Sequence, residues 1–171
     1  MNSQIQYPVL RKLLMPFCIF ACTIMLYIPA KAQEKPPKPI AVEVSTLQHL
    51  SFGTFIQAGD FGTITVTPQQ ARTSTGSVII PNMSSIVTAA LFEVTALPGT
   101  LITIVNGPAS SLGGNGGTVS LTIGDSSTGS PFIARDNLTE VFIGGTLTVG
   151  PLSANPAGNY SGTFTVTFIQ Q

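Results

Sequence analysis

Beyond residue 40, apolar residues alternate with polar ones along most of the chain, and this period of two constrains the fold more than any other feature. The last such segment is the clearest, with one side formed by Tyr160, Phe164, Val166 and Phe168. Threonines and serines occupy the other side. Successive side chains of a strand point to opposite faces of a sheet, so the pattern indicates half-buried strands. No sustained helical period competes with it, and we predict an all-β fold.

The alternating segments are short and recur at regular spacing: residues 40–45, 63–67, 90–96, 101–105, 118–123, 146–149 and 160–168. Turn residues separate them. Pro98-Gly99 suits a type II turn, and Asn115-Gly116 is a strong hairpin pair because both residues tolerate positive φ. Gly144-Gly145 is expected to break Val141–Ile143 from Thr146–Val149 through a bulge or corner. The spacing predicts an immunoglobulin-like, pilin-like β-sandwich of about seven to nine antiparallel strands over residues 40–171.

The N-terminus has the features of an export signal. Arg11 and Lys12 form a basic step, an apolar run follows, and Ala30-Lys31-Ala32 supplies the small residues of a cleavage site. We therefore predict a signal peptide over residues 1–32, with Gln33 as the first mature residue.

Two alternatives to a cleaved signal stay open. A membrane anchor is disfavoured because the run, residues 13–28, falls short of the roughly 20 apolar residues that span a bilayer, and it contains Pro16. A lipid-modified Cys22 is a minority alternative, since Phe20 fits that motif poorly and the apolar run continues past the cysteine.

The mature chain would begin with a proline-rich tether, residues 33–39, which leads into the sandwich. Both cysteines, Cys18 and Cys22, would leave with the signal, so neither a disulfide nor a thiol nucleophile is expected. Three of the seven basic residues also leave, whereas all seven acidic ones stay. A mildly acidic chain is not expected to bind nucleic acid, and no membrane span is expected after cleavage.

The sequence offers little for catalysis. His49 is the single histidine, and no serine stands in a Gly-x-Ser-x-Gly turn. Asp60, Asp125 and Asp136 each neighbour turn residues, which such side chains cap, and they lack the spacing of a calcium loop. The glycine run at 113–117 lacks the Lys-Ser/Thr of a phosphate loop. We expect no enzyme, no cofactor and no metal site.

Several blocks together resemble one family of exported bacterial proteins. The run Gly62–Pro68, followed by Arg72 and Gly76, is similar to that family's GTVTV-P…R…G block. The family's L-x-FG, F-x-V-T…PG and closing GGTLTV…GTFTVTV elements look like Leu50–Gly53, Phe92–Gly99 and the stretch 143–168. The match covers residues 40–170 and identifies the chain as similar to domain-of-unknown-function family 4402 (DUF4402).

The resemblance implies a protein secreted to the periplasm or cell surface of a Gram-negative bacterium, in a family without an established activity. In size and strand pattern the family resembles spore-coat-U and pilin-like domains. Family members usually end in an aromatic residue next to a terminal Gln. Here Ile169-Gln170-Gln171 stands instead, so no role for such an aromatic is carried over.

Two functions follow as hypotheses. The first is a structural or adhesive subunit that joins copies of itself or related subunits by strand addition. Its candidate donor strand carries Ile40, Val42 and Val44, and its terminal strand runs from Tyr160 to Phe168. The strand count also permits a self-complete sandwich in which both segments are ordinary edge strands. The second is a monomeric secreted module that binds a glycan or protein through its loops, although the mature chain has no Trp and one Tyr.

Overall fold

The structure is a computed structural model that describes residues 41–44 and 48–171. These residues contain strands and no helix, as the alternation predicted, and so no helix among them could cross a membrane. The strands are β1 (Ala41–Val44), β2 (Ile56–Val66), β3 (Arg72–Ile79), β4 (Ala90–Thr95), β5 (Leu101–Asn106), β6 (Ser110–Gly114), β7 (Gly117–Ser126), β8 (Phe132–Ile133), β9 (Leu138–Val149) and β10 (Val166–Gln170).

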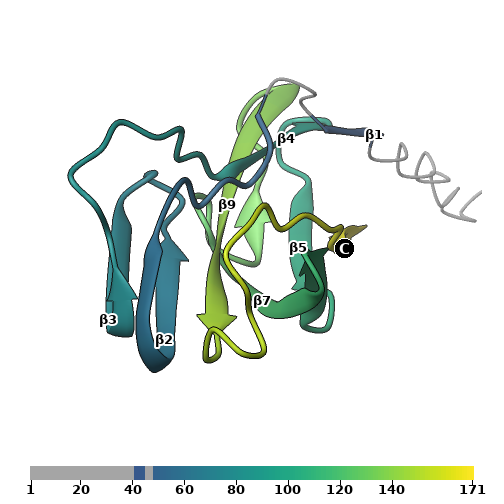
Figure 1. Cartoon of the computed structure of the whole chain (residues 1–171). Helices are drawn as coiled ribbons and strands as arrows, with labels where there is room; N and C mark the ends of the chain where they lie inside the picture. Colours follow the sequence, from purple (N-terminus) through teal and green to yellow (C-terminus); the bar gives the residue numbers. More distant parts are fainter. Residues whose placement is uncertain (1–40, 45–47) are drawn as a thin grey trace, which may run out of the picture. The chain divides into compact units, whose positions relative to one another are not determined.

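The larger of two antiparallel sheets is built around β9 (Figure 1). One edge of β9 pairs first with β4 and then with β2, while its other edge pairs with β7. Beyond these neighbours lie β1 next to β4, β3 next to β2 and β6 next to β7. The long central strand therefore holds together the pairs β1–β4, β2–β3 and β6–β7.

The Gly144-Gly145 pair does not break a strand, so the predicted break was wrong, although the pairing of β7 with β9 has a bulge-like register shift opposite Gly144. β9 runs without interruption, and its edge changes partner here: Ile143 pairs with Ala90 of β4, whereas Gly145 pairs with Val66 of β2. A Cβ added at Gly144 would collide with the Val66 carbonyl oxygen. The glycine is needed for close approach of two backbones, one of the uses of glycine inside a strand.

The two predicted turns are present. Asn115 and Gly116 have φ of 43° and 82° and close the β6–β7 hairpin, and Gly99 has φ of 89° between β4 and β5. β6 itself was not predicted, because its sequence of two serines, a leucine and two glycines has weak strand propensity. Pairing with β7 along its whole length supplies the order that its composition does not.

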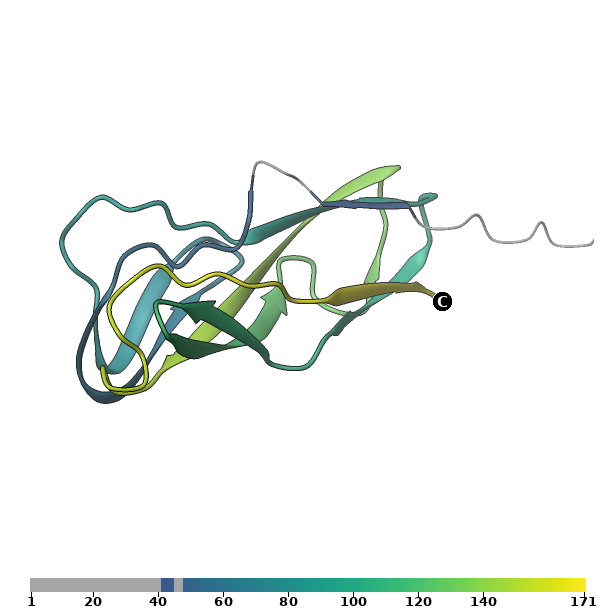
Figure 2. The same ribbon diagram turned by 45° about the vertical axis from the view of Figure 1, so that its right-hand side comes forward.

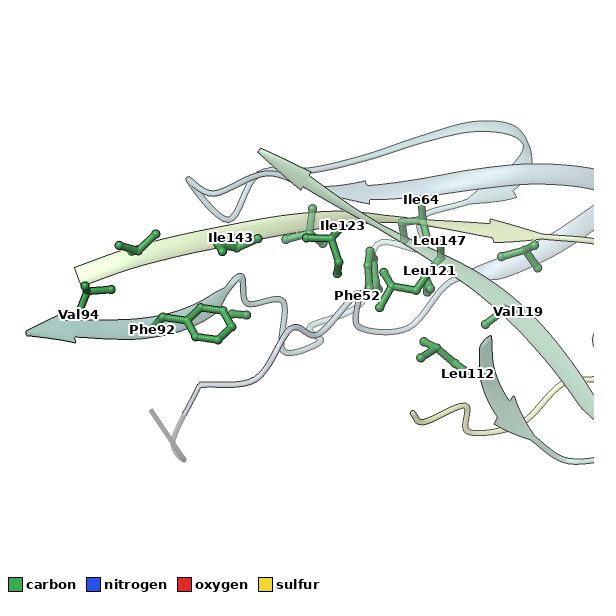
Figure 3. Close-up of a cluster of buried hydrophobic side chains, with 14 of the residues drawn as sticks. Phe52, Ile64, Phe92, Val94, Leu112, Val119, Leu121, Ile123, Ile143 and Leu147 are labelled. Atoms are coloured by element: carbon green, nitrogen blue, oxygen red, sulfur yellow. The ribbon is translucent and has the colours of Figure 1, made fainter. Parts of the chain in front are cut away.

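The second sheet is small and has the order β10–β5–β8, with β10 near the end marked C in Figure 2. A core of buried apolar side chains draws on both sheets, and Figure 3 shows part of it. Its most enclosed members are Ile64, Val66, Val94, Ile102, Val141 and Ile143. The two sheets and their shared core give the sandwich-like arrangement expected from the strand pattern.

The outer face of the large sheet carries rows of hydroxyl side chains. Register places Thr75, Thr63, Thr148 and Ser120 in one row across β3, β2, β9 and β7. Within such rows the Thr63 and Thr75 hydroxyl oxygens lie 2.7 Å apart, and those of Thr65 and Thr146 lie 2.9 Å apart. Cross-strand hydroxyl pairs stabilise a sheet without charge, which accounts for the scarcity of charged residues on these strands.

Candidate binding groove

An open groove of about 1190 Å³ lies between two segments that are far apart in sequence, residues 48–57 and 155–166. The middle of each segment, 52–55 and 162–165, lies outside any strand. The second segment leads directly into β10, and it crosses in front of the large sheet in Figure 1, where it is yellow. The groove therefore lies beside the small sheet.

The floor of the groove is apolar and comes from the large sheet, with Phe92 from β4, Leu121 from β7, and Leu147 and Val149 from β9. Several of these side chains are labelled in Figure 3. No Asp, Glu, Lys or Arg is among the lining residues. The volume exceeds the range of about 300–1,000 Å³ usual for small-molecule pockets. The site suits an extended, uncharged and largely apolar occupant.

The C-terminal rim of the groove, residues 155–166, has an edge whose backbone groups pair with nothing in the described part of the chain. The Ser161 amide and carbonyl bond to Gly113 at 3.0 and 2.9 Å, and the Thr165 carbonyl accepts from the Gly107 amide at 2.8 Å. The peptide groups of alternate residues in an extended chain point to opposite sides, so those of Gly162 and Phe164 point away from Gly107 and Gly113. Within the described residues neither Gly162 nor Phe164 makes a backbone hydrogen bond.

Residues 48–57 form the N-terminal rim of the groove. Contacts with residues that do not line the groove hold this rim in place. The Arg72 Nη1 donates to the carbonyl oxygens of Phe52 at 2.9 Å and Thr54 at 3.1 Å, and to the Ser85 hydroxyl at 3.2 Å. Gly53 has φ of 66°, and a Cβ there would lie 2.7 Å from the same Nη1. One guanidinium therefore fixes a tight bend in the rim.

The buried side chain of Asn155 is among the residues that line the groove. Its Nδ2 donates to the Thr118 carbonyl, and its Oδ1 accepts from the Gly150 amide. Close by, the Gln57 Nε2 donates to the Gly150 carbonyl at 2.8 Å, whereas the Gln57 Oε1 is buried without a partner. These bonds tie the chain after β9 to β7 and β2, and so fix where the C-terminal rim begins.

The predicted terminal strand packs against the core with its apolar side, since Tyr160, Phe164, Val166 and Phe168 are all partly buried there. The ring centroids of Phe164 and Phe168 lie 6.5 and 5.5 Å from that of Phe92. Regular strand pairing begins only at Val166, the first residue of β10. Tyr160 and Phe164 precede this strand and belong to the C-terminal rim of the groove. Tyr160, Phe164 and Val166 line the groove.

The candidate donor residues Val42 and Val44 lie in β1, which pairs antiparallel with β4 at the edge of the large sheet. Register sets Val42 opposite Val94 and Val44 opposite Phe92. Ile40 and the predicted cleavage residues Ala30, Ala32 and Gln33 lie outside the described residues, as do the signal peptide and the tether.

The N-terminal rim was not predicted as part of a site. Leu50–Gly53 appeared in the sequence only as a short apolar element, and nothing in it indicated that it would face Tyr160 and Phe164 across a groove. His49, the one histidine, is exposed at the groove's rim. Among residues 48–171, no three His, Cys, Asp or Glu side chains gather in a group that could hold a metal ion.

Residues 42–169 match the family model described as Domain of unknown function (DUF4402). The chain belongs to the DUF4402 family. The match confirms the resemblance seen in the sequence blocks, and it spans both sheets and both rims of the groove. Neither the curated proteins nor the solved structures include a match to this DUF4402 chain.

Proposed function

We propose that this DUF4402 protein is an exported, non-catalytic surface protein, a structural or adhesive subunit with an immunoglobulin-like, pilin-like sandwich. It works in an assembly of copies of itself or related subunits. The observation that supports this proposal best is the groove between residues 48–57 and 155–166, where residues 162–164 make no backbone hydrogen bond with the described part of the chain.

Apolar lining side chains that stay exposed favour association. The floor residues Leu121 and Leu147 are already buried, whereas the lining residues Ile56 and Leu152 are 50% and 54% exposed. Each square ångström of such apolar surface that a partner removes from water contributes about 25 cal/mol. Large exposed apolar surfaces bordered by polar residues commonly mark sites of protein–protein interaction. Here the border is formed by hydroxyl and amide side chains such as Thr54, Asn159 and Thr163.

The same groove offers little for catalysis. His49 and Tyr160 are its only titratable lining side chains. The Tyr160 hydroxyl already donates to the Pro156 carbonyl at 2.6 Å, and His49 is exposed at the rim. General acid–base catalysis requires a positioned group within hydrogen-bond reach of the reacting atom, usually oriented by a second one. A role in binding fits these residues better.

The test is the state of the exported protein, purified from cells with its natural N-terminus. We expect sedimentation velocity to show assemblies larger than a monomer that grow with concentration. Antibody labelling of intact cells should detect the protein at the surface, with lysed cells as the control. A stable monomer at every concentration would contradict the proposal, and would favour instead a monomeric module that binds a glycan or protein.

A further inference from the structure

We infer that the groove is a strand-acceptor site, and that its occupant is residues 38–46 of a second copy of this chain. The inference rests on the proposed function, because it names the contact through which the subunits would join. In this arrangement β1 leaves β4 of its own chain and adds to the open edge of a neighbour, between residues 48–57 and 155–166.

The backbone of the rim favours a strand over other occupants. An extended chain placed along Gly162 and Phe164 can pair with their free amides and carbonyls, as in β-strand addition. An unpaired strand edge is a ready template for such pairing. A lipid chain could cover the apolar floor, but it could not form hydrogen bonds with these peptide groups.

The side chains of the donor segment match the groove. Ile40, Val42 and Val44 form one apolar side of an extended chain, and the alternate side carries Ala41, Glu43 and Ser45. With the apolar side toward the floor, Glu43, the one charged residue of 40–45, points to solvent, and Lys38 lies at the end of the segment. A groove without charged residues among its described lining can accept residues 40–45 with no charge buried.

The position of β1 in its own chain is weakly held. β1 has four paired residues, lies at the edge of the large sheet and has β4 as its one neighbour. Register also sets Glu43 opposite Glu93, which is itself opposite Glu140 of β9. Like charges directly opposite one another destabilise strand pairing. The row of three glutamates therefore favours release of β1 from β4.

Disulfide trapping tests the site directly. Two single-cysteine variants, Glu43→Cys and Thr163→Cys, are made in full chains that also carry Cys18→Ser and Cys22→Ser, then purified after export and mixed under mild oxidation. Both positions are expected on the outer side of the completed sheet, where neighbouring strands bring Cα atoms within the roughly 4.4–6.8 Å that a disulfide needs. Thr165→Cys, two residues further along the rim, covers a shifted register.

We expect a disulfide-linked dimer from Glu43→Cys mixed with Thr163→Cys or Thr165→Cys. The matched control, Glu43→Cys with Ser120→Cys, should give none, because Ser120 is exposed on the large sheet away from the groove. Assemblies that persist without any groove cross-link would overturn this inference and leave the proposed function standing. A monomer that never assembles would overturn both. A cross-link inside one chain that carries both cysteines would show that β1 fills its own groove, and would also overturn exchange.

A second variant tests the release of β1 without touching the groove. Glu93→Gln removes the charge opposite Glu43, so β1 should stay on β4 and the population should shift from assemblies toward monomer. Asp60→Asn makes the same charge change at an exposed position far from this row and should leave the distribution unchanged. Equal assembly by Glu93→Gln and the parent protein would contradict the proposed release.

Discussion

The large sheet and the layer beside β10 are built from the same kind of alternating segment, yet one is closed and the other is open. In the large sheet β9 has partners along both edges, and Ile64, Val141 and Ile143 are fully buried. Beside β10, residues 162–164 make no backbone hydrogen bond within the described residues, and apolar lining residues such as Ile56 and Leu152 remain exposed. The alternation of apolar and polar residues determines which side chains point into the core. Whether every strand edge is paired depends on how many strands are available.

The difference separates the stability of the subunit from its capacity to associate. In the large sheet β9 is paired on both edges over residues 143–148, with β4 or β2 on one edge and β7 on the other. In the layer beside β10, part of the apolar surface stays unburied, and backbone hydrogen-bonding groups are left available to a partner. The following substitutions are ordered from the largest expected effect to the smallest, and each asks whether the two regions differ as described.

The largest contrast should come from the core. Ile64→Ala removes a fully buried side chain of the closed region and should lower the free energy of unfolding by about 2–5 kcal/mol. Leu112→Ala removes a side chain of similar size that lines the groove, where neighbours and solvent can fill the space, and should fall at or below the low end of that range. Urea unfolding of the monomer measures both. Equal losses would show that the groove region is as tightly packed as the closed core.

An intermediate effect is expected from the arginine that holds the N-terminal rim. Arg72→Ala leaves the Phe52 and Thr54 carbonyls without their donor and should cost about 1–3 kcal/mol. Amide hydrogen exchange should quicken around residues 51–55 and stay slow in β9. Arg135→Ala, at an exposed arginine, is the control and should change neither. Faster amide exchange throughout the protein after Arg72→Ala would mean that the N-terminal rim does not open separately from the large sheet.

The smallest effect is expected on the outer faces. Thr65→Val removes the hydroxyl contact with Thr146 and should lower the unfolding free energy by about 0.2–1 kcal/mol. Thr163→Val, at an exposed rim position, should be close to neutral in the monomer. Thermal unfolding followed by circular dichroism compares the two. A larger loss at Thr163 than at Thr65 would reverse the expected order of the two regions.

Much of the fold could be predicted from local pattern. Alternation identified most of the strands that supply the core, because the side chains of a strand have a fixed period of two, but it missed β3, β6 and β8. The Asn115-Gly116 and Pro98-Gly99 turns follow from the conformations these residues permit. The blocks that led to the DUF4402 family are also local. Gly144 misled the prediction because the need for a glycine came from Val66, a residue far away in the chain.

The groove could not be predicted in the same way. The sequence by itself determined that Phe164 and Phe168 would turn to one side, and that a segment with Val42 and Val44 has an apolar face. Only the tertiary structure decided that residues 48–57 would stand opposite Tyr160 and Phe164 across a groove. The physical reason is that side-chain direction is set within each segment, whereas an unpaired edge exists only when every strand has found its place.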